Sequence, residues 1–415
     1  MTARQWTLLL LLVASVFLNY IDRSNLSLAG PMMQKEFSFS ARQMAWLFGA
    51  FFWTYALMQL FGVAGWLTDR FPAGLVLAGG LVVWSAATIL TGVLSGTAPL
   101  FAARLLVGGG ESIAYPCYSR IFASDIPEGH RGLGNALIDA GAKFGPAVGT
   151  LFGGLLLERV GWRWFFVVLG FATVLWVVPW IWVAPRGKSA ERAPAGQPGT
   201  LEILESRSAW GAFFGHFCGN YFWYFLLTWL PTYLVNDRGF PMARVVSITS
   251  LALLTIGSTT ILTGWISDAW IRAGASVTRA RKTMSVGGLA CATVVLPVAM
   301  VHNEKLSLAL LLASCLAFGT YASNHWAITQ TLAGPLAAGR WSSLQNGVGN
   351  LSGIVGAWLT GLIVDRTHSF GLAFAVAGLI ALTGAFLWGV VVGPVKEVEW
   401  RSATARALPS SPVSR

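Results

Sequence analysis

The chain has 415 residues, of which 55% are apolar and only 11% are charged, and its formal net charge is +11. A soluble domain carries about a quarter charged residues, so this composition excludes an ordinary soluble protein and predicts a multi-pass membrane protein in a lipid bilayer. The positive charge does not indicate a nucleic-acid partner, because the Lys and Arg residues lie in short loops between apolar runs, where they act as topology signals.

Twelve apolar windows follow one another along the chain, each close to the roughly 20 residues that a helix needs to cross a bilayer. They fall near residues 5–30, 43–66, 74–95, 98–122, 132–157, 163–184, 209–235, 244–267, 283–301, 306–331, 341–364 and 370–393. The stretch between the sixth and seventh windows is rich in Arg, Pro and Gly, which is typical of a solvated linker. We therefore expect an all-α membrane protein of twelve transmembrane helices, with a six-helix half at 1–185, a cytoplasmic linker at 186–208, a second six-helix half at 209–393 and a cytoplasmic tail at 394–415.

The loop charges predict the orientation. An even number of spans places both termini on one side, and the loops on that side hold the larger share of Lys and Arg. Cytoplasmic loops are enriched in these residues, so we expect both termini in the cytoplasm. The expected location is a cell membrane, the bacterial inner membrane, where the protein functions as a monomer.

The first window contains an adjacent charged pair, Asp22-Arg23, inside an otherwise apolar run. Ionised groups at that depth cost roughly 2.5–3.5 kcal/mol each, which a polar cavity offsets. Neighbouring residues on a helix project about 100° apart, so each charge needs a partner on another helix. In the fourth window, Arg104 and Glu111 are separated by two turns and share one helix face. The sequence therefore predicts that these two windows face each other across the first half.

The two halves repeat. Gly65-Trp66-Leu67-Thr68-Asp69 ends the second window, and Gly264-Trp265-Ile266-Ser267-Asp268 ends the eighth. Such repeats are typical of transporters whose halves rock around a site near the middle of the membrane.

On these segments the chain resembles the major facilitator superfamily. The segment Gly65–Phe71 is similar to the family's loop between spans two and three, and Arg104–Gly108 is similar to its fourth-span motif. Within the family the match narrows to the anion:cation symporter branch. That match rests on Tyr20-Ile21-Asp22-Arg23, Arg104 with Glu111 and Tyr115-Pro116, Gly161-Trp162-Arg163-Trp164, Trp229-Leu230-Pro231-Thr232-Tyr233-Leu234 and Asn346-Gly347-Val348-Gly349-Asn350.

The resemblance implies proton-coupled symport of a small organic anion, most often a sugar acid of the hexonate, hexuronate or hexarate type. The alternatives are a carrier of aromatic acids or dicarboxylates, or a sensor that binds the anion without moving it. No metalloprotease, serine-hydrolase or nucleotide-loop motif occurs in a fitting context, so we expect no enzyme and no cofactor beyond the coupling proton.

Charge balance gives a physical basis for coupling. An Arg fork binds a carboxylate well, and an ionised acid beside that Arg competes with the ligand until it is protonated. The expected roles are proton coupling for Asp22 and Glu111, substrate binding for Tyr20, Arg23, Tyr55, Arg104, Trp326 and Asn346, and gating for Asp69, Arg70, Arg131 and Asp268. Further candidates are Gln59, Asp139, Lys143, Asn324 and Asn350. Structural ion pairs that tie helices together are the alternative for the charged residues, and Asp139 and Lys143 are spaced to pair with each other.

Overall fold

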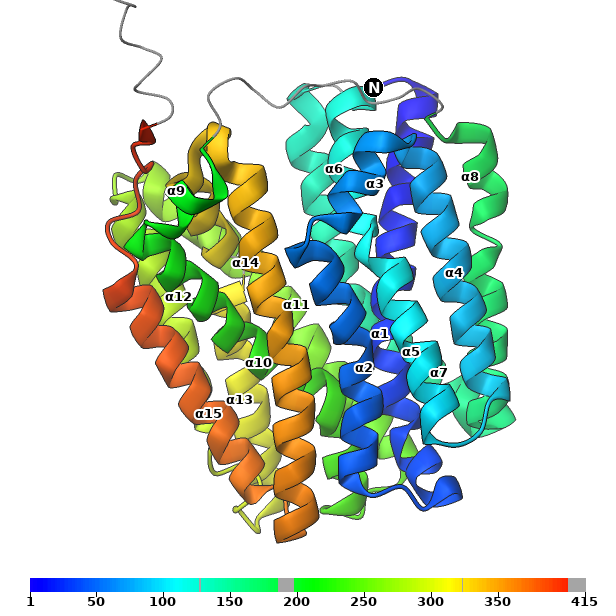
Figure 1. Ribbon diagram of the computed structural model, residues 1–415. Coiled ribbons are helices and arrows are strands. Elements are labelled where there is room, and N and C mark those ends of the chain that lie inside the picture. Colours follow the sequence, from blue (N-terminus) through cyan, green and yellow to red (C-terminus); the bar gives the residue numbers. More distant parts are fainter. Residues whose placement is uncertain (127, 186–197, 323, 402–415) are drawn as a thin grey trace, which may run out of the picture.

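The computed structural model describes the chain except residues 127, 186–197, 323 and 402–415, and it excludes the side chains of residues 69, 122–124, 128–136, 139, 143, 335 and 338. The described residues form helices without a strand. In Figure 1, helices α1 to α8 gather in one bundle and helices α9 to α15 in another, as the twelve-span interpretation predicts. Among the described residues, seven helical stretches are long and apolar enough to cross a membrane by length and composition alone.

The helices of the first bundle are α1 (Ala3–Phe37), α2 (Ala41–Leu60), α3 (Val63–Arg70), α4 (Ala73–Val93), α5 (Thr97–Ser112), α6 (Ala114–Asp125), α7 (Glu128–Val174) and α8 (Val177–Val183). Those of the second are α9 (Thr200–Leu204), α10 (Arg207–Asn236), α11 (Met242–Arg272), α12 (Val277–Ala292), α13 (Glu304–Ala322), α14 (Asn324–Thr367) and α15 (Gly371–Phe386), with short helical turns at Thr293–Val295 and Leu387–Val391.

Several helix boundaries differ from the predicted windows. The second window is broken into α2 and α3 at Gly62, whose φ is +69°. The fourth is broken at Ile113, because Pro116 in the first turn of α6 has no N–H to continue the ladder from Ser112. The fifth and sixth windows correspond to the two helical parts of α7, which are separated at Gly161, where the backbone leaves helical geometry (φ +76°). In the same way, Gly334 (φ +61°) separates the two helical parts of α14.

Glycines on α7 bring this helix directly against α1. A Cβ atom at Gly145 would lie 2.9 Å from the Phe17 carbonyl oxygen, and one at Gly141 would lie 2.7 Å from a Val16 methyl group. Small residues spaced by four let two helix backbones approach closely. This contact fixes the rotation of α1, and with it the direction in which the Asp22-Arg23 pair points.

The two bundles meet along a seam where α2 packs on α14, α7 on α11 and α1 on α10. At the end away from the N-terminus they are tied by polar contacts: the Arg42 backbone N–H donates to Asp365 Oδ2 at 2.9 Å, and Asn236 Nδ2 donates to Gln34 Oε1 at 3.3 Å. Figure 1 shows the bundles leaning together at that end, with the N-terminus and the last described residues at the other.

Candidate functional site

A close contact between α5 and α2 positions the fourth-window charges. A Cβ atom at Gly108 would lie 2.0 Å from the Phe51 carbonyl oxygen, so only glycine allows this approach. The Thr54 hydroxyl reinforces it by donating to the Leu105 carbonyl oxygen at 2.6 Å. Arg104 and Glu111 flank Gly108 on either side, and both are buried against the first bundle.

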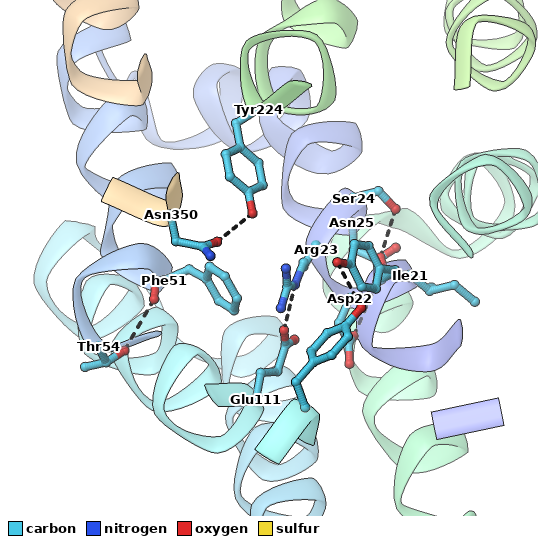
Figure 2. A network of polar contacts seen from close by, with 12 residues as sticks. Ile21, Asp22, Arg23, Ser24, Asn25, Phe51, Thr54, Glu111, Tyr224 and Asn350 are labelled. Atoms are coloured by element: carbon cyan, nitrogen blue, oxygen red, sulfur yellow. Dashed lines mark hydrogen bonds and ion pairs between the residues drawn. The ribbon is translucent and has the colours of Figure 1, made fainter. Parts of the chain in front are cut away.

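Arg23 and Glu111 form an ion pair between α1 and α5. Arg23 Nε donates to Glu111 Oε2 at 3.0 Å, and the two side chains are only 4% and 0% exposed. This pairing across helices is the geometry that the spacing predicts, and Figure 2 shows it at the centre of the site. Breaking such a buried pair on one side costs several kcal/mol, because the remaining charge is left without a partner in a medium of low polarity.

Aromatic rings enclose the Arg23 guanidinium. Its Cζ lies 4.6 Å from the ring centroids of Tyr20 and Tyr55 and 5.0 Å from that of Phe51. The Tyr115 hydroxyl, which donates to the Tyr20 hydroxyl at 3.4 Å, supports one of these rings. Ring faces attract a cation and hold its plane, so these contacts fix the orientation of the guanidinium.

Asp22 also has an opposite charge on another helix, because it lies within electrostatic reach of Arg104 on α5. On its own helix Asp22 accepts a hydrogen bond from Asn25, with Nδ2 donating to Oδ1 at 3.4 Å. Asp22 is 2% exposed, and its second carboxylate oxygen has no hydrogen-bond partner among the described residues. Asp22 is therefore a buried acid whose Oδ2 atom could accept a further hydrogen bond.

Unused polar atoms of the other charged residues cluster in the same region. Glu111 Oε1, Arg23 Nη2 and Arg104 Nε are buried and lack a hydrogen-bond partner within the described part of the chain. Buried polar groups are otherwise almost always paired, so these atoms mark a place where ligand, proton or solvent completes the network.

A cavity lies at the seam beside these groups. It is narrow, with a free volume of about 20 Å³, which is room for one water molecule. Its lining comes from both bundles: Arg23, Leu26, Ser27, Phe48, Phe51, Phe52 and Arg104 from the first, and Leu227 and Thr228 of α10 from the second. The two guanidinium groups can bind the carboxylate of a small anion, and the apolar side chains of the lining can pack against its carbon skeleton.

The polar candidates of the second bundle lie on α14. Asn350 Oδ1 accepts a hydrogen bond from the Tyr224 hydroxyl at 2.7 Å (Figure 2). Asn346 Nδ2 donates to Gln59 Oε1 at 2.7 Å, which joins the two bundles. The Trp326 ring is partly buried and packs edge-on against the His216 ring, with centroids 4.8 Å apart.

The remaining candidates lie at helix ends or outside the description. Asp268 pairs with Arg281 at 2.6 Å, and Asn324 accepts from the same Arg281 at 3.1 Å, so Asn324 belongs to this helix-end cluster. Arg70 is exposed at the end of α3. The predictions for four further residues rest on side chains outside the described part: Asp69, Arg131, Asp139 and Lys143.

Eight residues of the site are missing from the sequence-based list. Tyr224 contacts Asn350, and seven others line the cavity: Leu26, Ser27, Phe48, Phe51, Phe52, Leu227 and Thr228. Tyr224 lies in a run of aromatic residues on α10 that lipid contact alone would explain, so only the neighbouring α14 marks it as polar. Arg281 was also not predicted, because the sequence separation between Arg281 and Asp268 does not indicate that the two side chains pair.

The comparisons agree with this architecture. The sequence profile described as "Major Facilitator Superfamily" matches residues 12–357. A protein named "Probable galactarate/D-glucarate transporter GudP" from Bacillus subtilis (strain 168) is 30% identical, over 96% of this chain and 94% of its own. A "D-galactonate transporter" from Escherichia coli O6:H1 is 28% identical, over 95% and 97%.

Solved structures support the fold. A bacterial homolog of the human lysosomal transporter Spinster, crystallised in an inward-facing and unoccupied conformation, superimposes with a TM-score of 0.76 over 94% of this chain and 96% of that chain, at 17% identity. At 17% sequence identity this structural similarity supports the fold but not the function. The profile match, the relatives and the helix arrangement lead to one assignment: the chain belongs to the Major Facilitator Superfamily and is a multi-pass membrane transporter, not an enzyme.

Proposed function

We propose that the protein carries a small organic anion, a sugar acid, together with protons by alternating access. One observation supports this most directly. Arg23 and Arg104 line a cavity at the seam between the bundles. The carboxylate of Glu111, whose side chain is completely buried, forms an ion pair with the Arg23 guanidinium. An anion that enters the cavity competes with the Glu111 carboxylate for the same guanidinium.

The charge count gives the coupling its direction. Asp22, Arg23, Arg104 and Glu111 are two acids and two bases, so their net charge is zero when all four are ionised. Protonation of one acid leaves a net positive charge that matches a monoanion, and protonation of both matches a dianion. Since a buried net charge is costly, protons and anion favour each other's binding. If more protons than anionic charges cross, the membrane potential also drives uptake.

The proposed substrate class comes from the relatives. Those named for galactarate, D-glucarate and D-galactonate cover nearly the whole chain. In our proposal a carboxylate lies at Arg23 and Arg104, the sugar hydroxyls face the Tyr and Asn side chains, and Trp326 and Asn346 complete the site from the second bundle. Aromatic acids and simple dicarboxylates remain the competing substrates, and a sensor that binds without transport is the competing function.

We also propose the orientation and the gates. Both termini lie in the cytoplasm of a bacterial cell, and the contacts Arg42–Asp365 and Gln34–Asn236 close the outer face. The Asp268–Arg281 pair and the Asp69, Arg70 and Arg131 positions act at the inner face. Labelling of single cysteines at Asn303 and Gly274 with a membrane-impermeant reagent on intact cells tests the orientation. We expect reaction only at Asn303.

Uptake into proteoliposomes tests the function. Labelled D-glucarate, galactarate and D-galactonate are offered with and without an inward proton gradient, and Arg23→Ala serves as the inactive control. We expect gradient-driven accumulation that a protonophore abolishes. Accumulation that ignores the gradient would contradict proton coupling. Uptake of benzoate or succinate in place of all three sugar acids would refute the substrate class, and binding without uptake would favour the sensor.

A further inference from the structure

A chain of directed hydrogen bonds leads from the middle of the site to the seam. The Tyr224 hydroxyl donates to Asn350 Oδ1 at 2.7 Å, and Asn350 Nδ2 donates to Asn346 Oδ1 at 3.0 Å and to the Asn346 carbonyl oxygen at 2.7 Å. Asn346 Nδ2 then donates to Gln59 Oε1 at 2.7 Å. The chain therefore crosses from α10 through α14 to α2 of the other bundle.

Every donor in this chain has a defined direction. A phenol has one O–H; Asn350 and Asn346 each accept through Oδ1 from the residue before them and donate onward through Nδ2, and Gln59 Oε1 is the last acceptor. Because the direction is set at Tyr224, a change in the partner of this hydroxyl alters the preferred orientation of Asn350 and then of Asn346. Polar networks in buried surroundings transmit such changes because unpaired members are costly.

Tyr224 lies next to the cavity and contacts one of its lining residues. Its ring packs edge-on against Phe52, a cavity-lining residue, with centroids 4.4 Å apart. Leu227, one turn further along α10, also lines the cavity. Tyr224 is 6% exposed and lies within electrostatic reach of Arg23, and in Figure 2 its hydroxyl points into the space between α1 and α14.

We propose that Tyr224 is an occupancy sensor, which donates its single O–H either to Asn350 or to a carboxylate bound at Arg23. This rests on the proposed function, since it requires an anion in the cavity. A carboxylate is the stronger acceptor, so binding withdraws the donor from Asn350. The amide chain then loses its first member, and the Asn346–Gln59 link between the bundles weakens. Substrate occupancy is thereby coupled to the contact that the bundles must remake during transport.

A double-mutant cycle tests this coupling. D-glucarate is titrated calorimetrically against the purified full-length protein, against Tyr224→Phe and Gln59→Leu, and against the double variant. Tyr224→Phe keeps the ring contact with Phe52 and removes the donor, and we expect it to raise Kd about fivefold to tenfold. Gln59→Leu frees the far end of the chain, so Tyr224 is held less firmly, and we expect Kd to fall about threefold.

The decisive quantity is the effect of Gln59→Leu in the Tyr224→Phe background. A coupled chain predicts that this effect shrinks to less than about 1.5-fold, whereas independent sites predict the same threefold change. Equal effects in both backgrounds would overturn the proposal. If Gln59→Leu does not yield folded protein, Gln59→Met, which has a similar length, replaces it in the same cycle.

Tyr221→Phe is the matched control. Tyr221 lies on the same helix, is 0% exposed, and its hydroxyl has no hydrogen-bond partner among the described residues. We expect its Kd and its response to Gln59→Leu to equal those of the unmodified protein. A loss of affinity equal to that of Tyr224→Phe would refute the assignment to Tyr224. If the unmodified protein binds none of the three sugar acids, the proposed function fails and this inference with it, whereas binding with an additive cycle refutes this inference alone.

Discussion

Replacing Glu111 by Gln isolates the charge that we assign to coupling. The amide retains an oxygen where Glu111 Oε2 now accepts from Arg23 Nε at 3.0 Å, and the two side chains differ little in size. The substitution therefore keeps the geometry of the contact and removes its negative charge. Arg23 becomes available to an anion without any proton being bound at position 111.

The structure sets the size of the expected effect. A hydrogen bond between the Arg23 guanidinium and a neutral amide contributes less than one in which both partners are charged, so exchanging carboxylate for amide lowers the competition for Arg23 by about 1–1.5 kcal/mol. Anion affinity should then rise about fivefold to tenfold at a pH where Glu111 is ionised. The sign follows from competition: in the unmodified protein affinity falls as the pH rises and Glu111 ionises, and in Glu111→Gln this fall is reduced.

The assay combines binding and transport. Kd for D-glucarate is measured between pH 5.5 and 8.5, and exchange and gradient-driven uptake are measured in proteoliposomes. We expect Glu111→Gln to keep exchange and to lose driven accumulation. Glu304→Gln, which removes an exposed acid paired with Arg244 far from the site, is the control and should behave like the unmodified protein. Driven uptake that survives in Glu111→Gln would exclude Glu111 as the coupling acid.

Three further substitutions probe the anion site, the seam and the C-terminal segment. Arg23→Lys keeps the charge but loses the planar fork and the ring contacts, so D-glucarate Kd should rise about tenfold or more, and an unchanged Kd would reassign the carboxylate site. Asp365→Ala removes the cap on the Arg42 N–H, worth about 1 kcal/mol, so the closed outer face should lose about fivefold in population, measured by spin-label distances across the seam. Trp400→Ala removes a ring that is 4% exposed, so we expect it to lower the Tm in detergent. Trp182→Ala removes a ring that is 82% exposed and is the control, which should leave the Tm unchanged. Equal Tm values for the two variants would show that the C-terminal segment around Trp400 is not anchored.

The length and apolar content of the chain determined its class and the approximate positions of its helices, because hydropathy is a local property of each segment. The helix spacing also indicated that Arg104 and Glu111 share a face and that Arg23 needs a partner on another helix. The breaks at Gly62 and Ile113 did not follow, since a glycine or proline permits a kink without requiring one.

Only the tertiary structure decided which buried groups meet. It paired Glu111 with Arg23 and placed Asp22 near Asn25 and Arg104, because the partner depends on how α1 and α5 are rotated and how deep each lies, and the glycine contacts set both. It also brought Tyr224 into the site, although its own segment looks like an ordinary aromatic helix. A contact between helices is a property of two surfaces, and the periodicity of one segment carries information about only one of them.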